Sequence, residues 1–412
     1  MLTAGAEQKN AVGSDGIIAG AGIVMLFLAQ DSGSAAQHKG PVLSDKGLKL
    51  EQVAEGLSFP TSMRFLDGDN MLVLQKEGQV RLVSQGELDE KPVLQLDVAT
   101  GAEQGLLGIA TWQDSVWLYS TASDRAELRN KAVKYSYDRN ERMLANGTVV
   151  LDLPGEPGPF HNGGKIAIGP DGYLYAVIGD TNAGGGMLDN EILGREPDDK
   201  SVILRVDRET GEPAEGNPFQ GKLARYYAYG IRNGFGMDFD PVSGQLWMTE
   251  NGPDSYDEIN VVEPGFNSGW HKIMGPIARS NATVSDLVTF NGSSYGDPAF
   301  SWQLPVGVTD IEFFESGKLG GQYENNVFVG DVNYGNLYFF RVNGDRTGLY
   351  FESPELGDLV ADGEIVDGKL LTEAESVTVG RGFGRITDIE TGPDGSLYIL
   401  TYEDGKIYRV TR

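Results

Sequence analysis

Residues 160–180 read Phe-His-Asn-Gly-Gly-Lys-Ile-Ala-Ile-Gly-Pro-Asp-Gly-Tyr-Leu-Tyr-Ala-Val-Ile-Gly-Asp, and this stretch predicts a β-hairpin. Apolar residues alternate with small ones over 166–168 and again over 174–178, and Pro170-Asp171-Gly172 between them has the composition of a tight turn. His161, one of only three histidines, precedes the first strand. It therefore lies at a strand end, where binding residues are common.

The same combination of a turn and two strands recurs along the chain. We count about six such units, spaced roughly 45 to 80 residues apart, which is typical of propeller blades with uneven loops. The units cover residues 67–83, 115–137, 173–207, 243–262, 326–342 and 392–410. The repeat predicts an all-β fold, a six-bladed β-propeller that forms one closed domain.

Composition narrows the set of partners. The formal net charge of −27 disfavours nucleic acid and anionic membrane surfaces, because both would be repelled. For the same reason, an anionic ligand would have to be held by locally placed cations. The chain has no cysteine, so disulfides, thiolate chemistry and cysteine-bound zinc are excluded.

The N-terminal segment differs from the repeats. Residues 16–29 form an apolar run of about 14 residues, close to the core of a signal peptide and short for a bilayer span. We therefore divide the chain into an N-terminal signal- or anchor-like segment with its linker, residues 1–46, and the propeller, residues 47–412. The interpretation is an exported, extracytoplasmic protein, either secreted or tethered to a membrane by this segment alone. Three glycosylation sequons, at Asn146, Asn281 and Asn291, suit export.

Residues 227–270 hold a second group of polar residues. Arg232-Asn233 stands between glycines just before a strand, and residues 249–260 read Thr-Glu-Asn-Gly-Pro-Asp-Ser-Tyr-Asp-Glu-Ile-Asn. Carboxylate and amide oxygens around an open Gly-Pro suit a hard cation such as calcium. An acidic turn capped by its own backbone fits the same residues equally well.

Two single residues have a simpler structural interpretation as well. A lone histidine at a strand end, such as His161, is often a hydrogen-bonded structural residue. Glu103, directly before the apolar run 105–110, could face a central channel, or it could simply be solvated.

Taken together, the motifs resemble the glucose/sorbosone dehydrogenase family of soluble quinoprotein aldose dehydrogenases. The resemblance covers residues 50–411 and includes His161-Asn-Gly-Gly-Lys, Gly169-Pro-Asp-Gly, Gly230-Ile-Arg-Asn, Glu250-Asn-Gly-Pro, Asp257-Glu-Ile-Asn, Pro264-Gly-Phe-Asn-Ser-Gly-Trp and Gly384-Arg-Ile-Thr-Asp-Ile. The family implies pyrroloquinoline quinone (PQQ) and calcium as cofactors.

The resemblance also implies roles for individual residues. His161 matches the catalytic base that takes the anomeric hydroxyl proton of an aldose as hydride leaves for the quinone. Arg232 matches the arginine at the quinone oxygen, and Asn233 a neighbouring cofactor contact.

The calcium ligands carry over in the same way. The backbone of Gly252 and Pro253 matches the ligands of the calcium that polarises the quinone. Asp257 and Glu258 match the acidic pair behind that loop, and the resemblance implies that they serve the calcium as well.

The chain departs from the family pattern at the quinone site. Asn333 replaces a lysine, and in an Arg-x-Arg-Asp type of motif Arg385 is kept while Thr387 replaces the second arginine. Glu103 stands where an amide can occur, and Ser268 where an aromatic is common. PQQ carries three carboxylates, so losing two cations predicts weaker binding unless another cation compensates; Arg381 is the candidate that the sequence offers.

Three functions fit these residues. The first is a calcium-dependent PQQ dehydrogenase that oxidises an aldose to its lactone and passes electrons to an external acceptor; His161 and Arg232 favour it. The second is a non-catalytic carbohydrate- or protein-binding propeller that has lost the quinone, favoured by Asn333 and Thr387. A calcium-dependent lactonase would need a ring of carboxylate and amide ligands at the channel centre.

Overall fold

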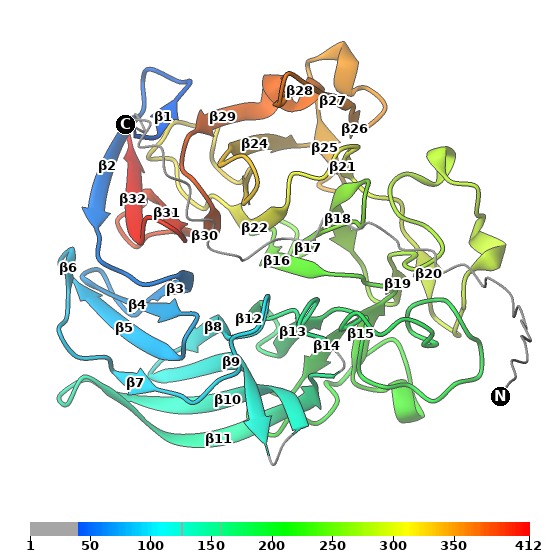
Figure 1. Cartoon of the computed structure of the whole chain (residues 1–412), viewed down its shortest axis with the longest axis horizontal. Coiled ribbons are helices and arrows are strands. Elements are labelled where there is room, and N and C mark those ends of the chain that lie inside the picture. Colours follow the sequence, from blue (N-terminus) through cyan, green and yellow to red (C-terminus); the bar gives the residue numbers. More distant parts are fainter. Residues whose placement is uncertain (1–39, 125–126, 157) are drawn as a thin grey trace, which may run out of the picture.

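The computed structural model describes residues 40–124, 127–156 and 158–412, and it is an all-β propeller. In Figure 1 the sheets follow one another round a ring, from blue at the N-terminal side to red at the C-terminal end. The apolar run 16–29 and most of the predicted linker lie outside the described residues. Within the described residues the only helices are short 3-10 turns, and none is long and apolar enough to span a bilayer.

Six sheets of four or more strands make up the ring within the described residues. The first three sheets contain β3 (Pro60–Phe65), β4 (Asn70–Gln75), β5 (Gln79–Ser84), β6 (Glu87–Leu88) and β7 (Leu94–Gln95); β8 (Leu106–Trp112), β9 (Ser115–Asp124), β10 (Glu127–Asp138) and β11 (Met143–Pro154); and β12 (Ile166–Ile168), β13 (Leu174–Ile178), β14 (Val202–Val206), β15 (Tyr226–Tyr229), β19 (Phe266–Asn267) and β20 (Ser294–Tyr295).

The next three sheets complete the ring. They contain β16 (Gly234–Phe239), β17 (Leu246–Glu250), β18 (Asp257–Val262), β21 (Phe300–Trp302) and β26 (Val360–Ala361); β22 (Val308–Phe313), β23 (Val327–Asp331), β24 (Leu337–Val342), β25 (Leu349–Tyr350), β29 (Thr378–Arg381) and β1 (Val42–Leu43); and β30 (Ile386–Thr391), β31 (Leu397–Thr401), β32 (Lys406–Thr411) and β2 (Lys49–Ala54).

Smaller elements decorate the ring. They are a separate hairpin of β27 (Gly363–Val366) and β28 (Lys369–Thr372), and the 3-10 turns η1 (Gly221–Leu223), η2 (Ile277–Arg279), η3 (Val284–Asp286), η4 (Pro354–Leu356) and η5 (Glu373–Val377).

The hairpin predicted from residues 160–180 is present as β12 and β13. The two strands pair antiparallel, with Ile166 opposite Ala176 and Ile168 opposite Leu174. Gly172 has a φ of 80°, a left-handed conformation that glycine adopts without steric cost, so the Pro-Asp-Gly turn reverses the chain as its composition predicts.

The two ends of the propeller are joined by strand pairing. β2, from the N-terminal side, pairs antiparallel with β32, the last strand of the chain, and Figure 1 shows the blue and red strands side by side. The first strands of the six sheets contact one another in a closed circuit: β3, β8, β12, β16, β22, β30 and back to β3. Val42–Leu43, assigned above to the linker, pairs with β29, and Leu43 packs against a core cluster.

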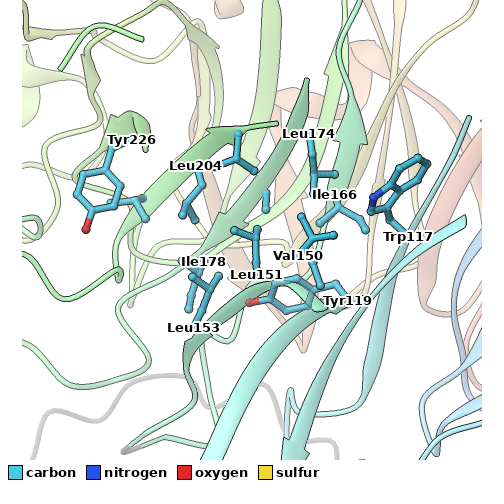
Figure 2. Close-up of a cluster of buried hydrophobic side chains, with 14 of the residues drawn as sticks. Trp117, Tyr119, Val150, Leu151, Leu153, Ile166, Leu174, Ile178, Leu204 and Tyr226 are labelled. Atoms are coloured by element: carbon cyan, nitrogen blue, oxygen red, sulfur yellow. The ribbon is translucent and has the colours of Figure 1, made fainter. Parts of the chain in front are cut away.

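Apolar side chains fill the spaces between adjacent sheets. Figure 2 shows one such cluster, in which Trp117 and Tyr119 of β9 meet Leu174 and Ile178 of β13. Each of these four side chains is fully buried. Because each sheet buries both faces against its neighbours, the strands need apolar residues on both sides, which explains continuous runs such as 174–178.

Candidate active site

One rim of the propeller gathers the polar motifs. In each sheet the first two strands are antiparallel, so the start of the first strand and the end of the second lie at the same edge; Gly234 of β16, for example, pairs with Glu250 of β17. Glu103, His161 and Arg232 each precede a first strand, while Asp180 and Gly252 each follow a second strand. The topology therefore brings residues far apart in sequence to one side of the ring.

His161 is held by a carboxylate that follows β13. Its Nδ1 lies 2.6 Å from Oδ1 of Asp180, and both side chains are buried. Trp270 Nε1 donates to the other oxygen of Asp180 at 2.9 Å, and the backbone N–H of Asn182 donates to Oδ1 at 2.7 Å. Burial raises the pKa of Asp180, but the hydrogen bond from His161 and the backbone bond from Asn182 outweigh it and hold that pKa below its usual range. Asp180 is thus an ionised group that fixes the imidazole through Nδ1.

Glu103 faces the site rather than the solvent. It is 7% exposed, and its Oε2 accepts the backbone N–H of His161 at 2.7 Å. The same carboxylate lies 3.3 Å from Nδ2 of Asn233. His161 itself has a φ of 58°, so the bond to Glu103 secures a backbone conformation that is uncommon outside glycine.

Arg232 lies at the centre of the constellation. Its Nη1 donates to the carbonyl oxygens of Asn251 and Gly252, both at 2.9 Å, and its guanidinium lies 5.3 Å from the centre of the Trp270 ring. Its backbone N–H donates to Glu250, whose second oxygen accepts from Ser268 Oγ at 2.6 Å. Burial lowers the pKa of Arg232, opposed first by the charge of Asp180. Ser268 therefore supports the backbone of Arg232 through Glu250.

The Gly252–Pro253 loop is tied in place by Asp257. One oxygen of this fully buried carboxylate accepts the Gly252 N–H at 3.0 Å, and the other accepts three backbone N–H groups of residues 306–308 at 2.6 to 3.2 Å. Burial raises the pKa of Asp257 to about 6. Both oxygens are used for the backbone, so Asp257 fixes the position of the loop carbonyls.

Glu258 is engaged in a similar way. Its Oε1 accepts the Gly275 N–H at 2.5 Å and its Oε2 accepts from Asn260 at 2.9 Å. Burial, reinforced by the nearby Glu250, raises its pKa well above the usual range. In the described part of the chain, no three His, Asp or Glu side chains gather as a metal cluster.

A cavity opens along the axis of the ring. Each of the six sheets contributes to its wall, through Lys76, Glu103, Lys165, Phe235, Val332 and Thr387 among others. Lys165 donates to Asp310 at 2.5 Å and to Asp388 at 2.9 Å, which links three sheets across the axis. The cavity is therefore the central channel, and Glu103, which accepts the His161 N–H, is part of its wall.

Comparison with known proteins identifies the family. The glucose/sorbosone dehydrogenase family model matches residues 57–409. The chain belongs to this family. It is 28% identical to the aldose sugar dehydrogenase YliI of Escherichia coli over 378 residues, covering 88% of this chain and 93% of that protein.

Solved structures of the family agree in fold. A putative oxidoreductase (glucose dehydrogenase) of Thermus thermophilus matches with a TM-score of 0.66 and 29% identity, over 88% of this chain and 99% of that one. The PQQ-bound aldose sugar dehydrogenase of Streptomyces coelicolor matches with a TM-score of 0.65 and 25% identity, over 88% and 98%.

The residues that depart from the family pattern have different partners. Asn333 is exposed, and its backbone N–H donates to Val306 at 3.2 Å. Arg385 lies 3.3 Å from Glu403, and Thr387 Oγ1 donates to the Pro60 carbonyl at 3.0 Å on the cavity wall. Arg381, the compensating cation that the sequence offers, instead pairs with Glu375 and does not line the cavity.

Sequence reasoning missed three residues that line the channel or hold the polar side chains near it. Asp180 and Trp270 were quoted only as parts of motifs, yet they hold His161 and Arg232. Lys76, directly after β4, was not considered, although it lines the channel. The position of Lys76 directly after a second strand was the available signal, because Asp180 and Gly252 occupy equivalent positions.

Proposed function

We propose that this protein is a calcium-dependent PQQ dehydrogenase that oxidises an aldose at the anomeric carbon to a lactone and passes the electrons to an external acceptor. The observation that carries the proposal is the buried His161–Asp180 pair beside Arg232 and the Gly252–Pro253 carbonyls. A binding module would not need an imidazole oriented by a buried carboxylate.

His161 acts as the general base. Because Asp180 engages Nδ1, the neutral ring presents Nε2 to the substrate, and this nitrogen takes the proton of the anomeric hydroxyl. PQQ bound beside this base would supply the hydride acceptor for the same carbon. The charge of Asp180 then stabilises the imidazolium that forms.

Arg232 supplies positive charge beside the reacting groups. Its hydrogen bonds to two carbonyls and its contact with Trp270 fix the guanidinium before any ligand arrives. A cation held in this way in a buried setting stabilises developing negative charge without reorganisation. A lysine at position 232 would lose part of this stabilisation, because it lacks the planar guanidinium that makes two fixed hydrogen bonds.

The residues fit the implied cofactors. Asn233 and Asn251 are both buried, and their Oδ1 atoms have no hydrogen-bond partner within the described residues. Buried acceptors of this kind are rare, and they point to a polar ligand. The carbonyls of Gly252 and Pro253 would hold calcium, since neutral oxygens suit this ion, and Asp257 would keep them in place.

Two further proposals concern the whole chain. Each of the six large sheets would be one blade of a six-bladed propeller, supported by the closed circuit of first strands. The protein would be exported, and the support for this is the apolar run 16–29 together with the sequons at Asn146, Asn281 and Asn291, which are exposed.

Reconstitution tests the proposal. Purified protein is incubated with PQQ and calcium and assayed for dye-linked oxidation of a panel of aldoses, beside His161→Ala and Asp345→Asn as an exposed control outside the site. We expect turnover that needs both additions, is abolished in His161→Ala and is unchanged in the control. Failure of the wild-type protein to bind PQQ at micromolar concentration would refute the quinoprotein function.

A further inference from the structure

The backbone around His161 is held on both sides of the residue. His161 has a φ of 58°, which a residue other than glycine keeps only where its surroundings fix it. Its own N–H donates to Glu103. The next residue, Asn162, is fully buried, and its carbonyl accepts the hydroxyl of Tyr119 at 2.9 Å. A side chain of β9, in the second sheet, therefore fixes the peptide that follows the base.

The side chain of Asn162 is fixed by the same sheet. Its Oδ1 accepts from Nδ2 of Asn130, in β10, at 3.1 Å. The Asn130 Nδ2 also donates to the Pro154 carbonyl at 2.8 Å, and the Asn130 Oδ1 accepts from Thr121 at 2.7 Å. Both N–H groups and the oxygen of this fully buried amide are thus used. Asn130 can take only one orientation, and that orientation places an N–H against Asn162.

These polar groups border the apolar cluster of Figure 2, to which Tyr119 belongs. A hydrogen bond in such surroundings is stronger than one exposed to water, and buried networks of this kind are rigid. Asn162 keeps its own Nδ2 buried without a hydrogen-bond partner within the described residues, which costs stability. Stability alone therefore does not explain an asparagine here. Its two acceptor oxygens, which fix the chain beside His161, do explain it.

We infer that Tyr119 and Asn130 are positioning residues for His161, so that the second sheet determines where the base lies relative to Asp180. The inference rests on the proposed function for the role of His161 as a base. The Nδ1 of His161 lies 2.6 Å from Asp180, and a hydrogen bond this short tolerates little movement of the ring. Loss of either bond to Asn162 releases the peptide next to His161, and the imidazole then turns away from Asp180.

Two tyrosines of the same cluster provide a matched pair of variants. Tyr119→Phe removes only the hydroxyl that binds Asn162, and Tyr226→Phe removes a hydroxyl that donates to Asp199 at 2.8 Å. Both tyrosines are buried, and Figure 2 shows them at opposite ends of the cluster. Each variant loses one hydrogen bond, so an effect on His161 in Tyr119→Phe alone separates positioning from a general loss of stability.

NMR of the apoprotein tests the inference without an activity assay. The chain has three histidines, so protein that contains isotope-labelled histidine gives few ring-nitrogen signals, and His161→Ala assigns those of His161. The nitrogen shifts report which ring nitrogen carries the proton. We expect the neutral ring to carry it on Nδ1 in the wild type and in Tyr226→Phe, and a mixture of both tautomers in Tyr119→Phe. Signals of His161 that are unchanged in Tyr119→Phe, or changed equally in Tyr226→Phe, would overturn the inference.

The loaded protein gives a second measure. Quinone reduction by an aldose should be roughly three- to tenfold slower in Tyr119→Phe than in the wild type, the effect of one neutral hydrogen bond. The dissociation constant of PQQ should stay within about twofold, because the lost bond holds the base and not the cofactor. Reduction at the wild-type rate in Tyr119→Phe would also overturn the inference. If the wild type does not bind PQQ, the proposed function fails, and the NMR comparison still decides whether the second sheet positions His161.

A substitution one step further along the network covers the case in which Tyr119→Phe does not fold. Thr121→Val keeps the shape of the side chain but removes the hydroxyl that orients Asn130. It should produce the same mixture of His161 tautomers. Thr121→Ser, which keeps a hydroxyl, should retain the wild-type signals, and equal spectra for the two threonine variants would contradict the inference.

Discussion

The pair of His161 and Asp180 makes the most specific mutational prediction. In Asp180→Asn the side chain keeps its shape, but it has one acceptor oxygen where the carboxylate has two. The carboxylate now accepts from His161 Nδ1, Asn182 N–H and Trp270 Nε1 at 2.6, 2.7 and 2.9 Å. The single oxygen of asparagine can accept from the donors to one of these two positions. Its amide N–H groups would then face the donors at the other position.

The size of the effect follows from these contacts. A hydrogen bond to a charged group contributes about 1.5–3 kcal/mol, and each 1.4 kcal/mol changes a rate by a factor of ten. Loss of the bond that orients His161 should therefore lower the rate of quinone reduction by roughly 10- to 100-fold. The bond is made to the base rather than to the cofactor, so PQQ affinity should change less than about threefold.

Stopped-flow absorbance measures this rate directly. Wild type and Asp180→Asn are loaded with PQQ and calcium, mixed with aldose in the absence of oxygen, and followed at the quinone absorbance. Thermal unfolding of both proteins serves as the control for folding. A variant that binds PQQ and reduces it at a rate within twofold of the wild type would refute the role assigned to Asp180.

Three further predictions follow from the site and its carboxylates. Asp257→Asn should lower the free energy of unfolding by about 2–4 kcal/mol, because amide hydrogens would face the backbone N–H groups of residues 306–308. Urea unfolding of this variant beside Asp254→Asn measures the loss. Equal urea midpoints for the two variants would contradict the prediction. Asn333→Lys should tighten PQQ binding about three- to tenfold at low ionic strength, and by a smaller factor at high ionic strength. Titration of the protein with PQQ at both ionic strengths measures this difference. Weaker binding at low ionic strength would argue against a carboxylate of PQQ near this position. Burial raises the pKa of Asp257 to about 6 and that of Glu250 to about 7, so these carboxyls bind protons more tightly in the folded state than in the unfolded chain. The free energy of unfolding should therefore fall as pH rises from about 4 to 7. Melting temperatures measured with a chelator present should decrease over this range, and an increase would contradict the assignment.

Local patterns in the sequence predict much of the fold. The alternation in residues 166–178 and the Pro-Asp-Gly turn predict the β12–β13 hairpin, and the repeated unit of a turn and two strands predicts the propeller. Val42–Leu43 escaped prediction because a two-residue strand has no periodicity, and its position is set by pairing with β29. Short segments of this kind are determined by the sheet they join.

The sequence predicts a site residue only where a single short motif marks it. His161 and Arg232 stand out in their own motifs, but the partners that hold them are distant: Trp270 is 90 residues from Asp180, and Glu103 is 58 residues from His161. The sequence shows the carboxylate of Asp257 but not the four backbone N–H groups that donate to it. Hydrogen bonds to the backbone across sheets have no sequence pattern of their own.

The spectrum of bound PQQ under anaerobic conditions tests the central claim most directly. Protein loaded with PQQ and calcium is titrated with one equivalent of an aldose that supports turnover, and the product is identified by mass spectrometry and by its hydrolysis. We predict full reduction of the quinone with one equivalent of lactone in the wild type, and an oxidised spectrum that persists in His161→Ala. Reduction that proceeds equally in His161→Ala, or a quinone that stays oxidised in the wild type, would contradict the account.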